Sequence, residues 1–223
     1  MKKVIVRLAN GLGNQLFTYA AAYTFAKKNN FELYIDNESG FYKRSKYELH
    51  NFNLSTQIVE KKYKFLGIGA RIKRKFLIKT SKFQLKNKFI IEKKDQNKLT
   101  SFHPKQFNII FKDTLYIEGY FQSEKYYKWS LQSLLKEFSF KKNIMNQKVE
   151  TIKKLKESNS VSIHLRQNKF LKDEKHRNLN TLNLEFINNN VSLIKKGIKY
   201  FDNKLDNLQY FLWSNNFSDV KSL

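Results

Sequence analysis

Apolar and polar positions follow one another along the first half of the chain in a way that predicts strands alternating with helices. Short, mainly apolar runs at residues 4–8, 32–36 and 114–118 are typical of buried strands. Apolar residues at helical spacing follow at residues 14–28 and 124–138. Because strands that alternate with helices build parallel sheets, we predict an α/β domain here.

The second half of the chain repeats this pattern. Residues 161–165 and 209–213 are predicted strands, and residues 183–201 between them are a predicted helix. Its buried face is predicted from apolar residues at alternating steps of three and four: Leu184, Ile187, Val191, Ile194 and Ile198. Such a unit binds ligands at the carboxyl ends of its strands, where His164 and Arg166 lie. We expect two Rossmann-like domains, residues 1–155 and 156–223.

The turn between the first strand and the first helix is a candidate site. Gly11 and Gly13 are expected to let the backbone turn tightly and approach a ligand closely. The free N–H groups of the first helical turn can receive an anion, and Asn14 and Gln15 project from that turn. Spacing alone leaves two interpretations open, a ligand site and a plain strand-to-helix turn.

Three sequence runs together resemble one enzyme family. Residues 8–19 read LANGLGNQLFTY, residues 47–52 read YELHNF and residues 119–127 read GYFQSEKYY. They are similar to the G-G-L-G-N-Q-[ML]-F-Q-Y-A, Y-E-L-x-x-F and G-Y-F-Q-S-E-K-Y-F segments of the bacterial α-1,2-fucosyltransferases, glycosyltransferase family 11. The resemblance implies a glycosyltransferase fold of the B type, with an acceptor-side first domain and a GDP-fucose domain that starts near Val161.

A fourth run matches the family only in part. The family motif H-[IV]-R-R-G-D-Y falls on residues 164–170, HLRQNKF, in which Gln167 and Lys169 replace the second Arg and the Asp. In the family the first Arg holds the GDP phosphates, and a guanidinium there stabilises the charge that builds on the leaving diphosphate. We therefore predict catalytic roles for Arg166 and His164. The alternative is a surface arginine and a satisfied core histidine.

Two features of the second domain depart further from the family. Residues 210–217 resemble its F-x-I-F-S-D-D strand end with Asn at the acidic positions, and there Ser214 and Asn215 are predicted to meet the nucleotide. The family's N-S-T-F-S-W-W-G segment is missing, so we expect an incomplete GDP-sugar domain with reduced activity. With Lys169 at the acidic position, the general base stays unassigned among these carboxylates: Asp36, Glu118, Glu124, Asp173 and Glu174.

Composition narrows the chemistry. A chain with 41% hydrophobic and 15% aromatic residues is globular rather than disordered. The absence of Cys excludes disulfides, thiolate metal sites and a cysteine nucleophile. The four histidines lack metal-ligand spacing and there is no D-x-D motif, so we expect metal-independent transfer with no cofactor. We find no signal peptide and no membrane-spanning run, which favours a cytoplasmic protein.

The net charge of +24 adds three interpretations: contact with nucleic acid, contact with anionic lipid, and steering of an anionic donor. No nucleic-acid-binding motif supports the first. The densest basic segment, residues 61–98, holds Phe65, Ile68, Ile72 and Phe76 at helical spacing. We expect this helix to pack these residues on the core, with peripheral contact to the inner membrane face as the alternative.

The predicted activity follows from the resemblance. It is inverting transfer of L-fucose from GDP-β-L-fucose to the 2-hydroxyl of a sugar, a terminal galactose in surface polysaccharide or O-antigen synthesis. Three alternatives stay open: a related transferase with another GDP-sugar, an inactive fragment, and a non-catalytic basic protein that binds nucleic acid or membranes.

Overall fold

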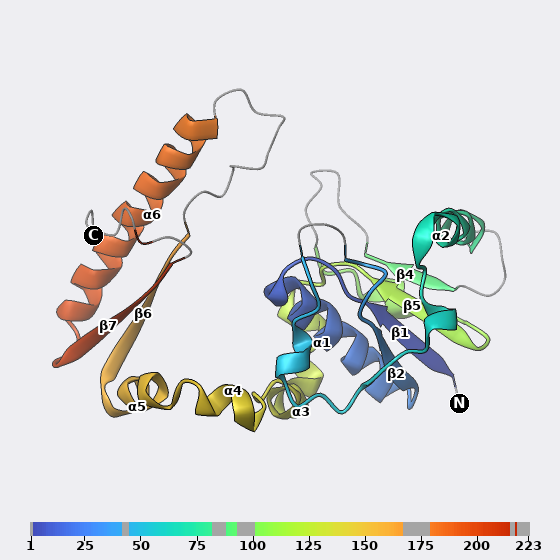
Figure 1. Ribbon diagram of the computed structural model, residues 1–223, viewed down its shortest axis with the longest axis horizontal. Helices are drawn as coiled ribbons and strands as arrows, with labels where there is room; N and C mark the ends of the chain where they lie inside the picture. The colour runs from blue at the N-terminus through green and yellow to red at the C-terminus, as the bar shows by residue number, and fades with distance from the viewer. Residues whose placement is uncertain are drawn as a thin grey trace. The chain divides into compact units, whose positions relative to one another are not determined.

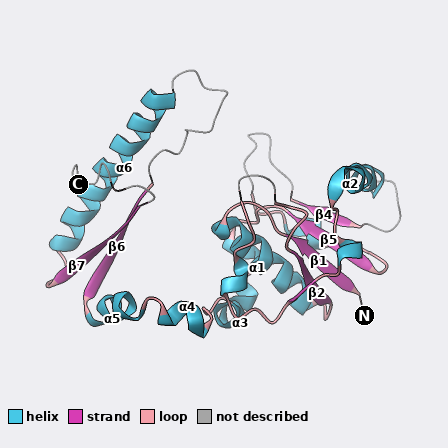
Figure 2. Ribbon diagram, in the orientation of Figure 1, coloured by secondary structure: helices cyan, strands magenta, loops and turns pink. Residues whose placement is uncertain are grey.

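A computed structural model describes residues 2–41, 45–81, 88–92, 101–166, 179–214 and 217. They form two compact units, Met1–Ile144 and Met145–Leu223. Figure 1 shows the elements of each unit in chain order, and Figure 2 separates helices from strands. Each unit is described by itself below.

A five-stranded parallel sheet forms the centre of the first unit, in the order β3-β2-β1-β5-β4. The strands are β1 (Lys3–Arg7), β2 (Glu32–Asp36), β3 (Gln57–Ile58), β4 (Phe89–Ile91) and β5 (Thr114–Glu118). The predicted α/β class is confirmed for this unit. The sequence did not predict β3 and β4, which are only two and three residues long.

Helix α1 (Leu12–Lys28) covers one face of this sheet. The core there joins Val4, Val6 and Leu8 to Tyr19 and Phe25 of the helix, all of them buried. Three consecutive alanines, Ala20 to Ala22, are also buried in this core. Their small side chains let neighbouring segments pack closely against the middle of α1.

Helix α2 (Gly67–Ser81) lies against the opposite sheet face, where Ile5 and Tyr116 form a smaller core. Its inward side chains include Ala70 and Leu77, which pack on that core. Phe65 is buried as expected, but it precedes the helix. The expectation that the other three apolar residues pack on the core was wrong, because they are 78%, 64% and 65% exposed: Ile68, Ile72 and Phe76.

An ion pair explains why the apolar side of α2 faces away from the core. Arg74 turns inward, and its Nε donates to Glu118 Oε1 at 2.8 Å. A residue two positions away on a helix lies about 200° around the axis. With Arg74 held on the inner side, Ile72 and Phe76 must face outward.

The segment after β5 differs from its prediction. The predicted helix at 124–138 is instead two short 3₁₀ turns followed by α3 (Leu131–Glu137). The buried Tyr126 gives the physical reason, because its hydroxyl accepts hydrogen bonds from His103 N at 2.8 Å and Gln106 Nε2 at 2.9 Å. Three further 3₁₀ turns lie in the described part of this unit, at Leu49–Asn51, Lys61–Tyr63 and Pro104–Phe107. Helix α4 (Lys142–Asn146) follows α3.

The second unit contains α5 (Val149–Glu157), β6 (Asn159–Leu165), α6 (Leu179–Asp202) and β7 (Leu208–Ser214). Strands β6 and β7 pair in parallel, which confirms the predicted β-α-β pattern. The predicted face of α6 is half-buried except at Leu184, which is 60% exposed. With 24 residues α6 is about 36 Å long, and the seven-residue strands span about 23 Å, so part of the helix extends beyond them.

Candidate active site at the carboxyl edges of the strands

Three charged residues end the three central strands of the first unit. Arg7 is the last residue of β1, Asp36 of β2 and Glu118 of β5. Because the strands are parallel, all three lie at the same edge, where open α/β sheets bind ligands. Asp36 is fully buried, and the side chains of Arg7 and Glu118 are only 10% and 8% exposed.

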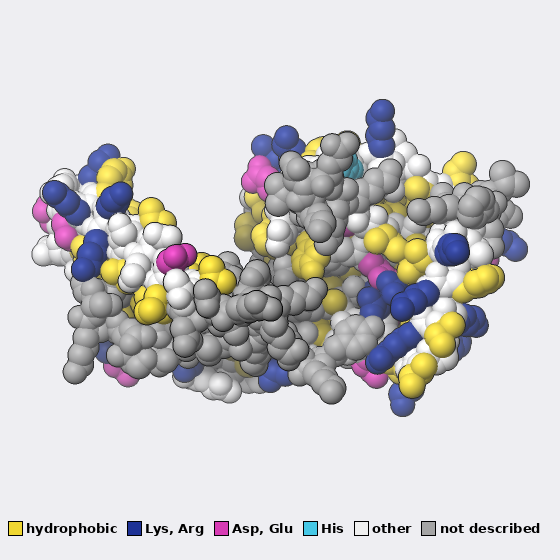
Figure 3. Space-filling view, turned by 90° about the horizontal axis from the view of Figure 1, so that it is seen from above, with side chains coloured by type: hydrophobic (Ala, Val, Ile, Leu, Met, Phe, Trp, Pro, Cys, Tyr) yellow, Lys and Arg dark blue, Asp and Glu magenta, His cyan; other side chains and the backbone are white. Residues whose placement is uncertain are grey.

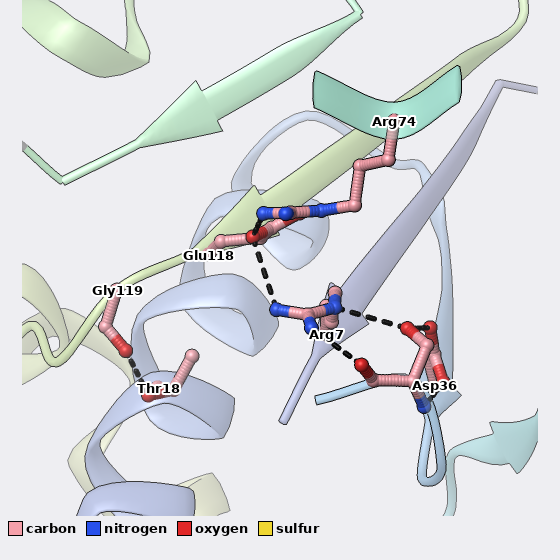
Figure 4. A network of polar contacts seen from close by, with 7 residues as sticks. Arg7, Thr18, Asp36, Arg74, Glu118 and Gly119 are labelled. Atoms are coloured by element: carbon pink, nitrogen blue, oxygen red, sulfur yellow. Dashed lines mark hydrogen bonds and ion pairs between the residues drawn. The ribbon is translucent and has the colours of Figure 1, made fainter. Parts of the chain in front are cut away.

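These residues form one network with Arg74 (Figure 4). The carboxylate of Glu118 accepts from both Nε and Nη2 of Arg74, and also from Nη1 of Arg7 at 3.3 Å. Arg7 Nε donates to Ser39 Oγ at 2.9 Å, and Ser39 donates in turn to Asp36. Two cations and two carboxylates thus balance one another at the edge of the sheet.

The network engages two of the candidate general bases, Asp36 and Glu118. Asp36 Oδ1 also accepts from the backbone N–H groups of Glu38 and Ser39, at 3.1 and 2.9 Å. Asp36 and Glu118 therefore already serve as acceptors within the chain. Glu124 is exposed, and its Oε1 lies 4.0 Å from Nζ of Lys128. The remaining two candidates, Asp173 and Glu174, lie outside the described residues.

Gln15 ties the opening run to the YELHNF segment. Its side chain is fully buried. The amide Nε2 donates to the carbonyls of Asn10 and Lys46, both at 2.8 Å, and Oε1 accepts from Glu48 N at 2.9 Å. Since its amide is engaged by three backbone groups, Gln15 holds the loop in place rather than facing a substrate.

The second motif run meets the same loop. Thr18 Oγ1 lies 2.8 Å from the carbonyl oxygen of Gly119 (Figure 4), and Gln122 Nε2 donates to Asn14 Oδ1 at 3.1 Å. Thr18 stands where the family usually has Gln. The three motif runs of this unit, far apart in sequence, therefore converge around the first turn of α1.

The geometry of the opening turn corrects one expectation. The left-handed residue is Asn10, with φ 65°, and Gly11 has φ −73°. A Cβ placed on Gly11 or Gly13 would meet nothing within 4 Å. The tight turn therefore falls on Asn10, and the two glycines leave open space in front of the helix.

Glu92 has a role that sequence reasoning missed. Its carboxylate accepts from Tyr120 N at 2.6 Å and from Phe121 N at 2.9 Å, where Phe121 adopts φ 47°. A Cβ on Gly119 would lie 2.4 Å from Glu92 Cβ, so only glycine fits there. A cavity of about 220 Å³ lies beside this turn, lined by these residues: Arg7, Ala9, Asn10, Ile91, Glu92, Glu118, Gly119 and Tyr120.

In the second unit the strand ends bring the predicted donor-side residues together. Register pairs His164 with Trp213 and Leu165 with Ser214, and Arg166 follows β6 directly. Leu165 is fully buried, but His164 and Arg166 are exposed. His164 is therefore not the satisfied core histidine of the alternative interpretation. Asn215, Gln167 and Lys169 lie outside the described residues.

Two features are absent from the described residues. Those residues contain no group of three or more His, Asp or Glu side chains arranged to hold a metal ion. In the same part of the chain, no helix has both the length and the apolar character needed to cross a membrane.

Comparison with known proteins gave one relative and a set of solved structures. No family model matches the chain. It is 26% identical over 226 residues to an alpha-1,2-colitosyltransferase of Escherichia coli, covering 99% of this chain and 71% of that protein. The NodZ alpha-1,6-fucosyltransferase soaked with GDP-fucose aligns with 12% identity and a TM-score of 0.47, covering 96% and 71% of the two chains. The fucosyltransferase NodZ from Bradyrhizobium aligns with 11% identity and a TM-score of 0.47, covering 96% of this chain and 72% of that chain. The resemblance drawn from the motifs is confirmed, and the chain is a distant homologue of the alpha-1,2-colitosyltransferase.

Proposed function

We propose that this protein is a glycosyltransferase that moves a 6-deoxy-L-sugar from a GDP donor to the 2-hydroxyl of an acceptor sugar. The strongest support is the homology to an alpha-1,2-colitosyltransferase across 99% of the chain. The convergence of three motif runs at one sheet edge supports it independently, because the hydrogen bonds of Gln15 and Thr18 join those runs.

Arg166 and His164 form the donor side of this proposal. Breaking the bond between sugar and phosphate builds negative charge on the departing GDP. A guanidinium at that point stabilises the transition state more than the ground state. Arg166 follows β6 directly and is exposed, so its side chain is accessible to the diphosphate of a donor. Ser214, at the end of the neighbouring strand, and Asn215 after it would contact the nucleotide.

Asn14, Gly11 and Gly13 form the acceptor side. The open space beside both glycines allows a sugar to approach the backbone closely. Gln122 donates a hydrogen bond to Asn14 at the same turn. Gln15 acts here as a positioning residue.

The donor sugar has two candidates. L-fucose is the one that the family resemblance implies, and the name of the homologue favours colitose, which is L-fucose without its 3-hydroxyl. A site that hydrogen-bonds the 3-hydroxyl rejects the sugar that lacks it, because its polar groups then stay unpaired. The ratio of the two turnover rates therefore distinguishes the candidates.

A transfer assay tests the proposal. The protein is incubated with GDP-β-L-fucose or GDP-colitose and a panel of β-galactosides, and product linkage and anomeric configuration are read by NMR. We expect α-1,2-linked product. We expect Arg166→Ala to lower kcat by about 100-fold or more, as when one oxyanion-stabilising donor is removed.

Lys153→Ala is the matched control, since Lys153 is an exposed cation of α5 in the same unit. It should keep the native rate. Full activity of a folded Arg166→Ala variant would remove the assignment of Arg166. Failure of the native chain to bind GDP or to use either donor would remove the proposed function as a whole.

A further inference from the structure

The outer face of α2 carries three exposed apolar side chains in a row. Ile68, Ile72 and Phe76 follow one another at steps of four, so they form one ridge along the helix. They are 78%, 64% and 65% exposed. The ridge lies opposite the side that packs on the sheet through Ala70 and Leu77. It is therefore an apolar face that the unit's own core leaves uncovered.

Cations border this ridge on both sides. The helix carries five basic residues and no acidic one: Arg71, Lys73, Arg74, Lys75 and Lys79. All except Arg74 are exposed. Figure 3 shows yellow apolar and dark blue basic side chains interleaved over α2. The chain as a whole carries a net charge of +24, so the field around this face attracts anionic surfaces.

We propose that this face of α2 docks on an anionic phospholipid membrane surface. A helix with bulky apolar residues on one side and Lys or Arg beside them lies in the headgroup layer, where the apolar side chains enter the acyl boundary and the cations meet phosphate. Both halves of this pattern are present on α2. The membrane contact does not depend on the proposed transferase activity.

Two other occupants fit less well. Nucleic acid would engage the lysines through its phosphates but offers no apolar phase for two isoleucines and a phenylalanine. A second copy of the chain would bring one basic helix against another, and like charges in an interface are unfavourable. An anionic lipid surface satisfies the ridge and the cations together.

The inner side of the helix gives this contact a consequence for the site. Arg74 of α2 binds Glu118 at the carboxyl edge of the sheet. The helix that meets the membrane is thus joined directly to the edge where the motif runs converge. Docking through α2 would hold that edge close to the headgroup layer, within reach of glycans attached to lipid.

Vesicle co-sedimentation of the full chain tests the proposal. Vesicles of phosphatidylglycerol and phosphatidylcholine are compared with pure phosphatidylcholine, at low and high salt. We expect binding to the anionic vesicles, weakened by salt. We expect Ile72→Gln/Phe76→Gln to lower the partition coefficient at least tenfold, and Lys75→Glu/Lys79→Glu to do the same.

A matched control is Ile110→Gln/Leu135→Gln, because those side chains are 77% and 59% exposed elsewhere on the same unit. It should bind within twofold of the native chain, and circular dichroism checks the fold of each variant. Equal binding by Ile72→Gln/Phe76→Gln, or no binding by the native chain, would overturn the proposal. So would a dimer, or a complex with duplex DNA, that depends on this face while vesicles are left unbound.

Discussion

Single polar side chains at the carboxyl edge hold the loops that carry the motif runs. Gln15 bonds three backbone groups, and Glu92 bonds two. Both side chains are buried. A buried polar group that loses its partner costs more than an ordinary hydrogen bond contributes, so these contacts fix loop geometry more strictly than surface contacts could.

Gln15→Leu should therefore destabilise the first unit. The substitution keeps the volume similar but leaves the carbonyls of Asn10 and Lys46 and the N–H of Glu48 without their partner. We expect a loss of about 3 kcal/mol in the free energy of unfolding, measured in urea. Gln122→Leu removes one exposed hydrogen bond and should cost less than about 1 kcal/mol. Equal losses in the two variants would contradict the role given to Gln15.

Asn10 makes a second residue-level prediction. It occupies the left-handed region at φ 65°, which Asn tolerates, Gly adopts freely and β-branched residues avoid. Asn10→Gly should change stability by less than about 0.5 kcal/mol, whereas Asn10→Val should cost about 1–2 kcal/mol. Thermal unfolding of both variants checks this order, and a Val variant as stable as the Gly variant would refute it.

At the scale of elements, the sequence predicted the strands better than the helix surfaces. Short apolar runs located β1, β2 and β5, because burial in a parallel sheet demands such runs. They also located β6 and β7, although most of those two strands is not buried. Periodicity failed for α2, where the pairing of Arg74 with Glu118 decides which side turns inward. It also failed at residues 124–130, where burial of the Tyr126 ring interrupts the helix. Both failures depend on partners distant in sequence.

Contacts between residues distant in sequence also limited what could be predicted of the candidate site. Asn14 and the opening turn were visible as a motif, but the Arg7–Glu118–Arg74 network and the role of Glu92 were not. The network required the order of the parallel strands, which no local pattern states. The available signal was a charge at the end of each of three apolar strands: Arg7, Asp36 and Glu118.

Tyr116, between α2 and the sheet, makes alkaline stability a test of that packing. Burial, reinforced by the charge of Asp36, raises its pKa from 10.0 to about 12. The folded state therefore favours the neutral phenol. Its contribution is complete below pH 10 and is lost as the pH rises from 10 to about 12. We expect a loss on the order of 2 kcal/mol across that window, measured by urea unfolding.

Tyr116→Phe should flatten this part of the pH profile, although it also removes the hydrogen bond to the Tyr63 carbonyl. Tyr200→Phe is the control, because that ring is 55% exposed. An unfolding free energy that stays constant across the window in the native chain would show that the phenol is not held in a buried environment.

At the scale of the whole molecule, the two units differ in how much they bury. The first has cores on both faces of its sheet. In the second, Leu165 and Asn183 are the only buried side chains among those described. Local stability follows buried apolar contact, so the two units should open separately rather than in one transition.

Amide hydrogen exchange measures this difference. We expect the N–H groups of β1 and β5 to exchange slowly, at the rate of global unfolding of the first unit. Those of β6 and β7 should exchange faster, through opening of the second unit alone. GDP added in excess should slow exchange in β6 and β7 if the second unit holds the donor. Identical protection in all four strands would contradict the separation.

The strand order of the first unit has a further consequence for folding during synthesis on the ribosome. The central strand β1 is paired on one side with residues 32–36 and on the other with residues 114–118. During synthesis its second hydrogen-bonding edge stays unpaired until the ribosome has released β5. An apolar strand left open for that interval is a hazard for aggregation, so assembly of this unit on the ribosome is a natural point for chaperone assistance.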